Sequence, residues 1–233
     1  MKDSPKQLFF KGVFDALPLI VGGVPFGIIF GTLALNAGLD GWQTMGLSSI
    51  VFAGSAQFVA VGMLAAGTSI GFIVGATLIV NLRHLIYAAS MLPYVKHLPQ
   101  RWRIPLGFLL IDEVFAATYP RHLDNPDSAN NHWHYLGVGV AFYVSWNLAT
   151  LVGLFFGSNI EGIGEWGLDF AMSATFIGMV MPHLINRPMI IAVLVSGALA
   201  VVCYDLPHKL GLVIASVVGM ATGYILEQQM KEQ

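Results

Sequence analysis

The stretch GWQTMGLSSIVFAGSAQFVAVGMLAAGTSIGFIVGATLIVNL, residues 41–82, contains no Asp, Glu, Lys or Arg. Because a helix needs about 20 mainly apolar residues to cross a bilayer core, this uncharged run is long enough for two membrane segments. Over the whole chain of 233 residues, 56% are hydrophobic and only 10% are charged, whereas about 25% of the residues of a soluble domain are charged. The sequence therefore predicts an integral membrane protein.

The apolar tracts are continuous and lack the alternating pattern of membrane β-strands. We therefore expect an all-α polytopic membrane protein, in which backbone hydrogen bonds close within helices. We predict a single transmembrane domain, residues 1–233, with about seven to eight hydrophobic segments and broken helices near 53–58 and 79–84. We expect the polar stretch 121–134 to be a solvated loop, because it is rich in turn-forming Asn, Asp and Pro. The predicted segments are 16–37, 42–66, 68–92, 104–120, 135–157, 168–184, 188–204 and 208–226.

Positive charges constrain the topology. Two groups of cations flank the first three segments: Lys2, Lys6 and Lys11 precede them, and Lys96, Arg101 and Arg103 follow them. The positive-inside rule places both groups in the cytoplasm, which requires an even number of crossings between them. We therefore predict that segment 42–66 or segment 68–92 does not cross fully and contributes to a hairpin of broken helices.

Arg83 and His84 interrupt the apolar tract that surrounds them. An arginine near the bilayer centre costs about 2.5–3.5 kcal/mol on insertion scales, although snorkelling towards an interface reduces that cost. Asn81 and Tyr87 lie in the same short stretch, and Tyr87 shares a helical face with Arg83 because the two are four residues apart. A polar stripe has no favourable partner in lipid, so we expect this face to point at protein or water.

A counter-charge occurs at Asp112 and Glu113, adjacent in another apolar segment. Consecutive helix positions point about 100° apart, so we predict that one carboxylate pairs with Arg83 while the other faces a cavity. The alternative is a purely structural cluster of ion pairs. His84, Asp112 and Glu113 are the candidates for proton coupling or counter-charge, since ionisable groups inside the membrane often mark ion pathways.

VFAGSAQFVAV, residues 51–61, is a second interruption. Gly54 and Ser55 can break a helix, and a break frees backbone N–H and C=O groups that can bind a zwitterion. The alternative is a close-packed seam in which Gln57 is hydrogen-bonded to a neighbour. Glycines every fourth residue at 23–31 and 67–75 are expected to pack helices closely, or to dock a partner helix.

Four strings together resemble the AzlC-type branched-chain amino acid transport family: DALPLIVGGVPFGIIFG (15–31), FAGSAQF (52–58), NLRHLIYAAS (81–90) and IDEVFA (111–116). The resemblance implies the large subunit of a two-component exporter of hydrophobic amino acids such as valine. It also implies a small AzlD-like membrane subunit as partner and a multi-pass location in the inner membrane.

A branched-chain amino acid needs a cation for its carboxylate, an acceptor for its ammonium and an apolar pocket. The resemblance thus implies a secondary transporter that exports such amino acids, and we expect it to be coupled to the proton gradient. A passive channel, or an importer with the same site, is the alternative. The predicted substrate-binding residues are Asn81, Arg83, Tyr87, Gly54, Ser55 and Gln57.

Other classes of function lack a signal. The sequence contains no HExxH, Walker A or Rossmann glycine motif and no convincing nucleophile–base pair, so we expect no enzyme, no cofactor and no metal site. The net charge of −2 argues neither for nor against nucleic acid, and we expect the lipid bilayer, not nucleic acid, to surround the chain.

Overall fold

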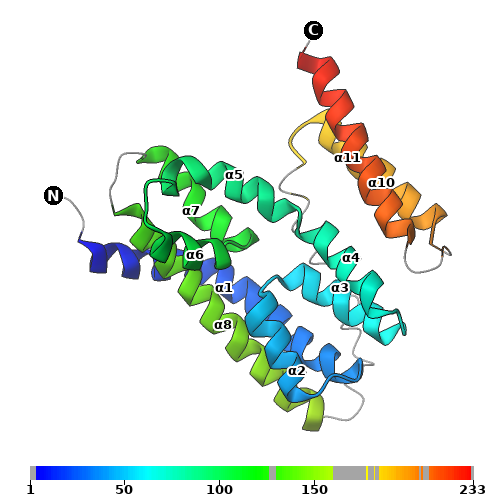
Figure 1. The fold of residues 1–233 in the computed structure, drawn as a ribbon, viewed down its shortest axis with the longest axis horizontal. Coiled ribbons are helices and arrows are strands. Elements are labelled where there is room, and N and C mark those ends of the chain that lie inside the picture. Colours follow the sequence, from blue (N-terminus) through cyan, green and yellow to red (C-terminus); the bar gives the residue numbers. More distant parts are fainter. Residues whose placement is uncertain are drawn as a thin grey trace. The chain divides into compact units, whose positions relative to one another are not determined.

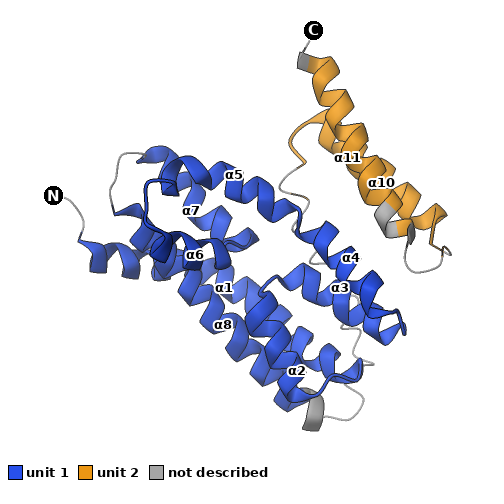
Figure 2. Ribbon diagram, viewed as in Figure 1, with its two compact units in different colours: residues 1–166 blue, residues 167–233 orange. Residues whose placement is uncertain are grey.

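The computed structural model describes residues 4–125, 130–159, 184–204 and 210–231, together with Ile177, Met181 and Leu206. Every regular element among these residues is a helix, which confirms the all-α prediction. The chain divides into two compact units, residues 1–166 and 167–233 (Figure 2), which we describe separately. The predicted segment 168–184 lies almost wholly outside the described residues, and the single transmembrane domain stays a prediction.

Two long helices, α1 (Pro5–Asn36) and α8 (Asn131–Asn159), lie side by side in unit 1 (Figure 1). Their contact leaves no room for side chains at several glycines. A Cβ on Gly12 would meet the backbone of His134, and one on Gly31 would meet the backbone of Thr150. Because these residue numbers rise together, α1 and α8 run in the same direction.

The chain after α1 forms a first hairpin of short helical pieces: α2 (Gly41–Gly46), the π-helical turn η1 (Leu47–Val51) and α3 (Gly54–Ala65). Ser48 Oγ lies 3.0 Å from Thr150 Oγ1, whereas the ring of Phe52 lies 5.0 Å from that of Tyr143. The first arm therefore runs against the direction of α8. Phe52 ends this arm in the left-handed region, with φ of 38°, and the chain reverses there.

The second arm, α3, runs back towards the end of α1, since the ring of Phe58 lies 6.0 Å from that of Phe30. Two further helices, α4 (Ile70–Asn81) and α5 (Arg83–Val95), then run the length of the unit. α4 is antiparallel to α3: Ile73 packs on Met63 near the outer end, and Arg83 donates to Ser55 at the inner end. The breaks at Phe52–Ala53 and Leu82 confirm the two predicted helix interruptions.

A second hairpin follows, made of α6 (Gln100–Phe108) and α7 (Asp112–Asp124). α6 runs along α8, because the Trp102 and Trp133 rings are 4.7 Å apart and Tyr135 donates to the Leu106 carbonyl at 2.7 Å. α7 returns to the same end, where the ring of His122 lies 6.3 Å from that of Tyr135. The two hairpins thus enter unit 1 from opposite ends.

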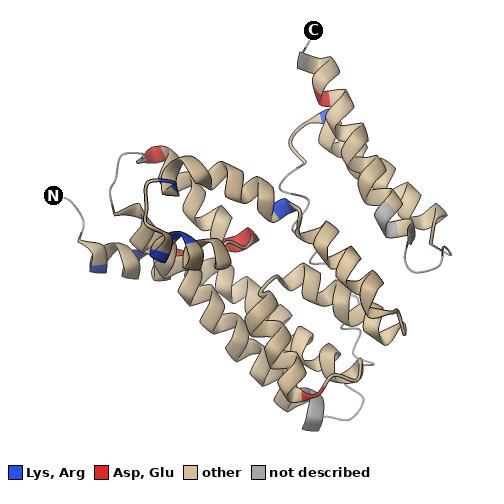
Figure 3. Ribbon diagram, in the orientation of Figure 1, with Lys and Arg blue, Asp and Glu red and all other residues tan. Residues whose placement is uncertain are grey.

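Lys and Arg gather at one end of unit 1, near the starts of α1 and α6 (Figure 3). α3 and α6 have 12 and 9 residues, about 18 and 14 Å of helix at 1.5 Å per residue, and are too short to cross a bilayer core of about 30 Å. α1, α8 and the joined α4–α5 are long and apolar enough to cross. That the hairpin over residues 41–65 is the segment that does not cross between the two groups of cations stays a prediction.

The prediction that residues 121–134 form a solvated loop is wrong at both ends. α7 continues to Asp124 and α8 already begins at Asn131. His134 is 1% exposed, because it lies against α1 and pairs with Asp15. Turn-forming residues mark only the middle of this stretch.

Unit 2 contains an antiparallel pair, α10 (Arg187–Val202) and α11 (Leu210–Lys231). A Cβ on Gly219 would meet Ser196, and one on Gly223 would meet Ala192. These glycines allow the two helices to pack closely.

Candidate functional site

Three helix breaks of unit 1 meet at one place. α3 begins at Gly54, the α4–α5 junction lies at Leu82, and α7 begins at Asp112. A helix start exposes backbone N–H groups and the positive end of the helix dipole. The chain therefore brings two helix N-termini and one arginine together.

Arg83 joins all three breaks. Its Nη2 lies 2.8 Å from Asp112 Oδ2 and also donates a hydrogen bond to Ser55 Oγ. The side chains of Arg83 and Asp112 are 26% and 19% exposed, so the pair is only partly covered by the chain itself. Of the two predicted carboxylates, Asp112 is the one that pairs with Arg83.

Tyr87 holds the other oxygen of Asp112. Its hydroxyl donates to Asp112 Oδ1 at 2.6 Å, and its ring stacks on Phe115 with centroids 4.7 Å apart. Arg83 and Tyr87 thus act from one face of α5, as their four-residue spacing predicts. This arrangement fixes the carboxylate in both position and rotation.

Three buried polar atoms beside the ion pair have no hydrogen-bond partner in the described part of the chain: Asn81 Oδ1, Arg83 Nε and His84 Nε2. Buried polar groups are almost always paired, and an unpaired one costs about 1–3 kcal/mol. Asn81 Oδ1 and His84 Nε2 can accept a hydrogen bond, and Arg83 Nε donates one. The α4–α5 junction therefore offers donors and acceptors that a polar ligand can satisfy.

Glu113, next to Asp112, is half-buried. It lies in the first turn of α7, where the helix dipole favours a negative charge. That it faces a cavity stays a prediction.

Gln57 is fully buried and holds the first hairpin to α8. Its side-chain amide donates to the Leu47 carbonyl at 2.8 Å, and its oxygen accepts from Trp146 Nε1 at 3.1 Å. A Cβ on Gly54 would approach the same indole to 3.1 Å. These contacts match the structural alternative for Gln57, while its predicted role in binding substrate stays a prediction.

The sequence alone does not single out Tyr143 and Trp146 of α8. Tyr143 donates to the carbonyl of Ser49 at 3.2 Å, and Trp146 covers Gly54. A tryptophan or tyrosine in an apolar tract resembles ordinary lipid-facing or core residues, so no sequence signal separates these from the rest. Their positions depend on the tertiary fold.

A separate shallow hollow, with a cavity volume of only about 10 Å³, lies between α1 and α8, where Ile20, Val24, Phe142 and Trp146 are among its lining residues. Its lining contains no charged group. It lacks the chemistry to hold an ammonium or a carboxylate, so the ion pair is the stronger candidate site.

Fold and site together define a multi-pass helical membrane protein with a charged site at opposed helix breaks. The model of the AzlC protein family matches residues 18–160, more than half of the sequence. The chain therefore belongs to the AzlC family. The matched range includes Arg83, Asp112 and both hairpins.

Individual relatives cover most of the chain. It is 28% identical over 205 residues to the inner membrane protein YgaZ of Escherichia coli, which covers 85% of this chain and 83% of that protein. It is 30% identical over 169 residues to the branched-chain amino acid transport protein AzlC of Bacillus subtilis, covering 72% and 65%. An uncharacterized membrane protein of Helicobacter pylori is 30% identical over 230 residues, covering 96% and 98%. No solved structure matches the chain.

Proposed function

We propose that this protein is a secondary transporter, not an enzyme, that exports branched-chain L-amino acids such as valine across the bacterial inner membrane. The name of the Bacillus subtilis relative supports the substrate class, and that of the Escherichia coli relative supports the location. The observation that carries the proposal is the Arg83–Asp112 ion pair at three helix breaks. A zwitterion requires both signs of charge within a few ångströms.

In the proposed bound state, the substrate carboxylate takes a place on the Arg83 guanidinium beside Asp112. Arginine has five N–H donors in a planar fork, and its Nε is without a partner among the described residues. The free N–H groups at the start of α3, near Ser55, add a favourable dipole for an anion. Gly54 and Ser55 thus contribute backbone N–H groups, which favour the carboxylate of the substrate.

The substrate ammonium needs acceptors. Asp112, paired with Arg83, and the unpaired oxygen of Asn81, two residues before Arg83, are the proposed acceptors. Tyr87, held against Phe115, adds an apolar wall for the side chain. Since one methylene changes binding by only about 1–3 kcal/mol, we expect valine, leucine and isoleucine to share the site.

Coupling to the proton gradient requires a group at the site that changes charge during the cycle. His84, Asp112 and Glu113 lie within one turn of the breaks and are the proposed groups. Protonation of Asp112 would weaken its hold on Arg83 and free the guanidinium for substrate. We also propose that a small AzlD-like membrane subunit completes the transporter.

Counterflow in proteoliposomes tests the proposal. Purified protein, with and without a co-expressed small subunit, is given a panel of amino acids at two external pH values. We expect saturable counterflow of valine, leucine and isoleucine but not of lysine or glutamate. No counterflow of any hydrophobic amino acid under any condition would contradict the proposed function, and imposed gradients of either direction separate export from import.

Arg83→Lys sharpens the test. Lysine keeps the positive charge but lacks the planar fork that holds Ser55 and a carboxylate together, so we expect normal insertion and a higher half-saturating concentration of valine. Arg101→Lys, an exposed position on α6, is the matched control and should leave transport unchanged. Equal effects of the two substitutions would contradict the assignment of Arg83.

A further inference from the structure

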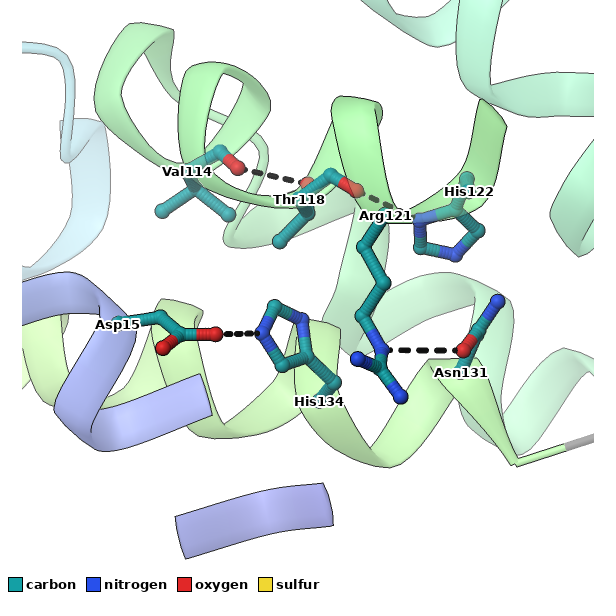
Figure 4. Close-up of polar contacts among 7 residues, drawn as sticks. All are labelled: Asp15, Val114, Thr118, Arg121, His122, Asn131 and His134. Atoms are coloured by element: carbon teal, nitrogen blue, oxygen red, sulfur yellow. Dashed lines mark hydrogen bonds and ion pairs between the residues drawn. The ribbon is translucent and has the colours of Figure 1, made fainter. Parts of the chain in front are cut away.

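A second pair of titratable groups lies at the end of unit 1 where Lys and Arg gather. Asp15 on α1 and His134 on α8 face each other across the interface between these helices (Figure 4), with Asp15 Oδ2 2.9 Å from His134 Nε2. The His134 side chain is 1% exposed and that of Asp15 is 46% exposed. One member of the pair is therefore sealed inside the bundle while the other reaches its surface.

The buried member has an unused nitrogen. His134 Nδ1 is buried and has no hydrogen-bond partner in the part of the chain that the structure describes. When His134 is neutral and donates to Asp15 through Nε2, Nδ1 is an unpaired acceptor, and when it is charged, Nδ1–H is an unpaired donor. A clamp that served only stability would not be expected to leave a buried nitrogen unpaired.

Charges of both signs face His134. The carboxylate of Asp15 attracts a proton on the ring, whereas the cations of Lys11 on α1 and Arg121 on α7 repel one. His122, 2% exposed, is the neighbouring titratable group on α7, and its Nδ1 lies 2.9 Å from the Thr118 carbonyl (Figure 4). Opposing charges around a histidine suit a group that both takes up and releases a proton.

The helices do not depend on this pair to stay together. Close backbone contacts occur beside the pair, where Gly12 meets the backbone of His134 and Gly137 meets that of Phe9. Replacing either titratable side chain by a neutral one of similar size should therefore leave α1 packed on α8. Neutral substitutions of Asp15 and His134 can therefore distinguish a role in proton binding from a role in helix packing.

We propose that Asp15 and His134 form a proton-binding pair, separate from the Arg83 site, that exchanges the coupled proton with water at the Lys/Arg-rich end of the bundle. His134 holds the proton inside the bundle, and Asp15 passes it to or accepts it from water, so only N–H and O–H bonds form and break. The inference rests on the proposed function in one respect, that the coupling ion is a proton.

Asp15→Asn and His134→Gln test the proposal in proteoliposomes by two assays: valine counterflow without a gradient, and valine transport driven by an imposed pH gradient. We expect both variants to keep counterflow and to lose most of the gradient-driven transport. His97→Gln, an exposed histidine between α5 and α6, is the matched control and should keep both activities.

Two outcomes overturn the proposal: gradient-driven transport that survives in both variants, or loss of both activities in variants that remain folded and monodisperse. Absence of transport in the unmodified protein instead contradicts the proposed function. A measurement that does not depend on transport tests the proposal even if the unmodified protein shows none. We expect one histidine NMR signal whose position changes with pH, which is absent from His134→Gln and displaced in Asp15→Asn; no such signal would also overturn the proposal.

Discussion

Arg83 is placed where a cation is costly, and its neighbours offset that cost. Asp112 supplies the opposite charge at 2.8 Å, Ser55 accepts a hydrogen bond from Arg83, and Tyr87 donates one to Asp112. Because the two side chains are 26% and 19% exposed, the pair remains accessible to a ligand or to a covering subunit.

Asp112→Asn should weaken the fold and abolish transport together. Removing one partner of a buried ion pair costs about 3–5 kcal/mol, and partial exposure reduces this to about 2 kcal/mol here. We expect a lower melting temperature in detergent micelles. Asp124→Asn, an exposed carboxylate at the end of α7, is the control, and an Asp112→Asn protein as stable as the control would contradict the coupling of the two charges.

Gln57→Leu should destabilise the first hairpin. The substitution leaves the Leu47 carbonyl and the Trp146 indole without their partner, and each buried unpaired group costs about 1–3 kcal/mol. Thermal unfolding followed by tryptophan fluorescence measures the effect. The same substitution at Gln100, exposed at the start of α6, should be neutral; equal melting temperatures for the two variants would argue against the clamp.

The sequence predicts that Arg83 pairs with Asp112 or Glu113, because each charge stands out against an apolar background and needs an opposite charge; only the structure shows that the partner is Asp112. The sequence does not predict the pair of Asp15 and His134, since both lie near segment ends where charged residues are ordinary. Nor does it predict Trp146, because an aromatic residue is common in any apolar tract and only the fold places it over Gly54.

At the scale of elements, the short helices and the order of their contacts along α8 define two hairpins, α2–η1–α3 and α6–α7, which enter unit 1 from opposite ends. The positive-inside rule predicts a hairpin of broken helices within residues 42–92, but the apolar pattern does not show where the chain reverses, because a kinked crossing helix and a hairpin have the same composition. Only the contacts of Ser48 with Thr150 and of Phe58 with Phe30 reveal that the chain turns back.

Cysteine labelling from each side of the membrane tests this topology in a Cys203→Ser background. Because each hairpin enters and leaves on one side, we expect Trp42→Cys and Ala66→Cys to react on one face and His97→Cys and Asp124→Cys to react on the other. All four positions are exposed. Trp42 and Ala66 reacting from opposite faces would show that residues 41–65 cross the membrane.

The two glycine series have different surroundings. A Cβ on Gly31 would collide with the backbone of Thr150, whereas one on Gly71 or Gly75 would meet nothing within 4 Å. Gly31→Ala should therefore destabilise the protein by about 1–3 kcal/mol, while Gly71→Ala should not. Thermal melting of both variants in detergent checks this, and an equal loss of stability in each would contradict the close packing of α1 on α8.

At the scale of the whole molecule, unit 1 contains both hairpins and the ion pair, and the family match covers most of it. In the most apolar stretch of the joined α4–α5 helix, only 6% of the residues are buried within the chain, although this helix carries Arg83. Lipid does not satisfy a polar face. The polar face that carries Arg83 is therefore expected to lie against protein or water, not lipid, in the membrane.

The central claim is that Arg83 binds the substrate carboxylate, beyond its role as partner of Asp112. Valine counterflow by the double variant Arg83→Ala/Asp112→Asn tests it most directly. Removing both charges together leaves neither one unpaired, so we expect a folded, inserted protein more stable than Asp112→Asn alone. We expect the double variant to show no valine counterflow above that of empty liposomes. Counterflow near the level of the unmodified protein would contradict it and make the ion pair a structural element only.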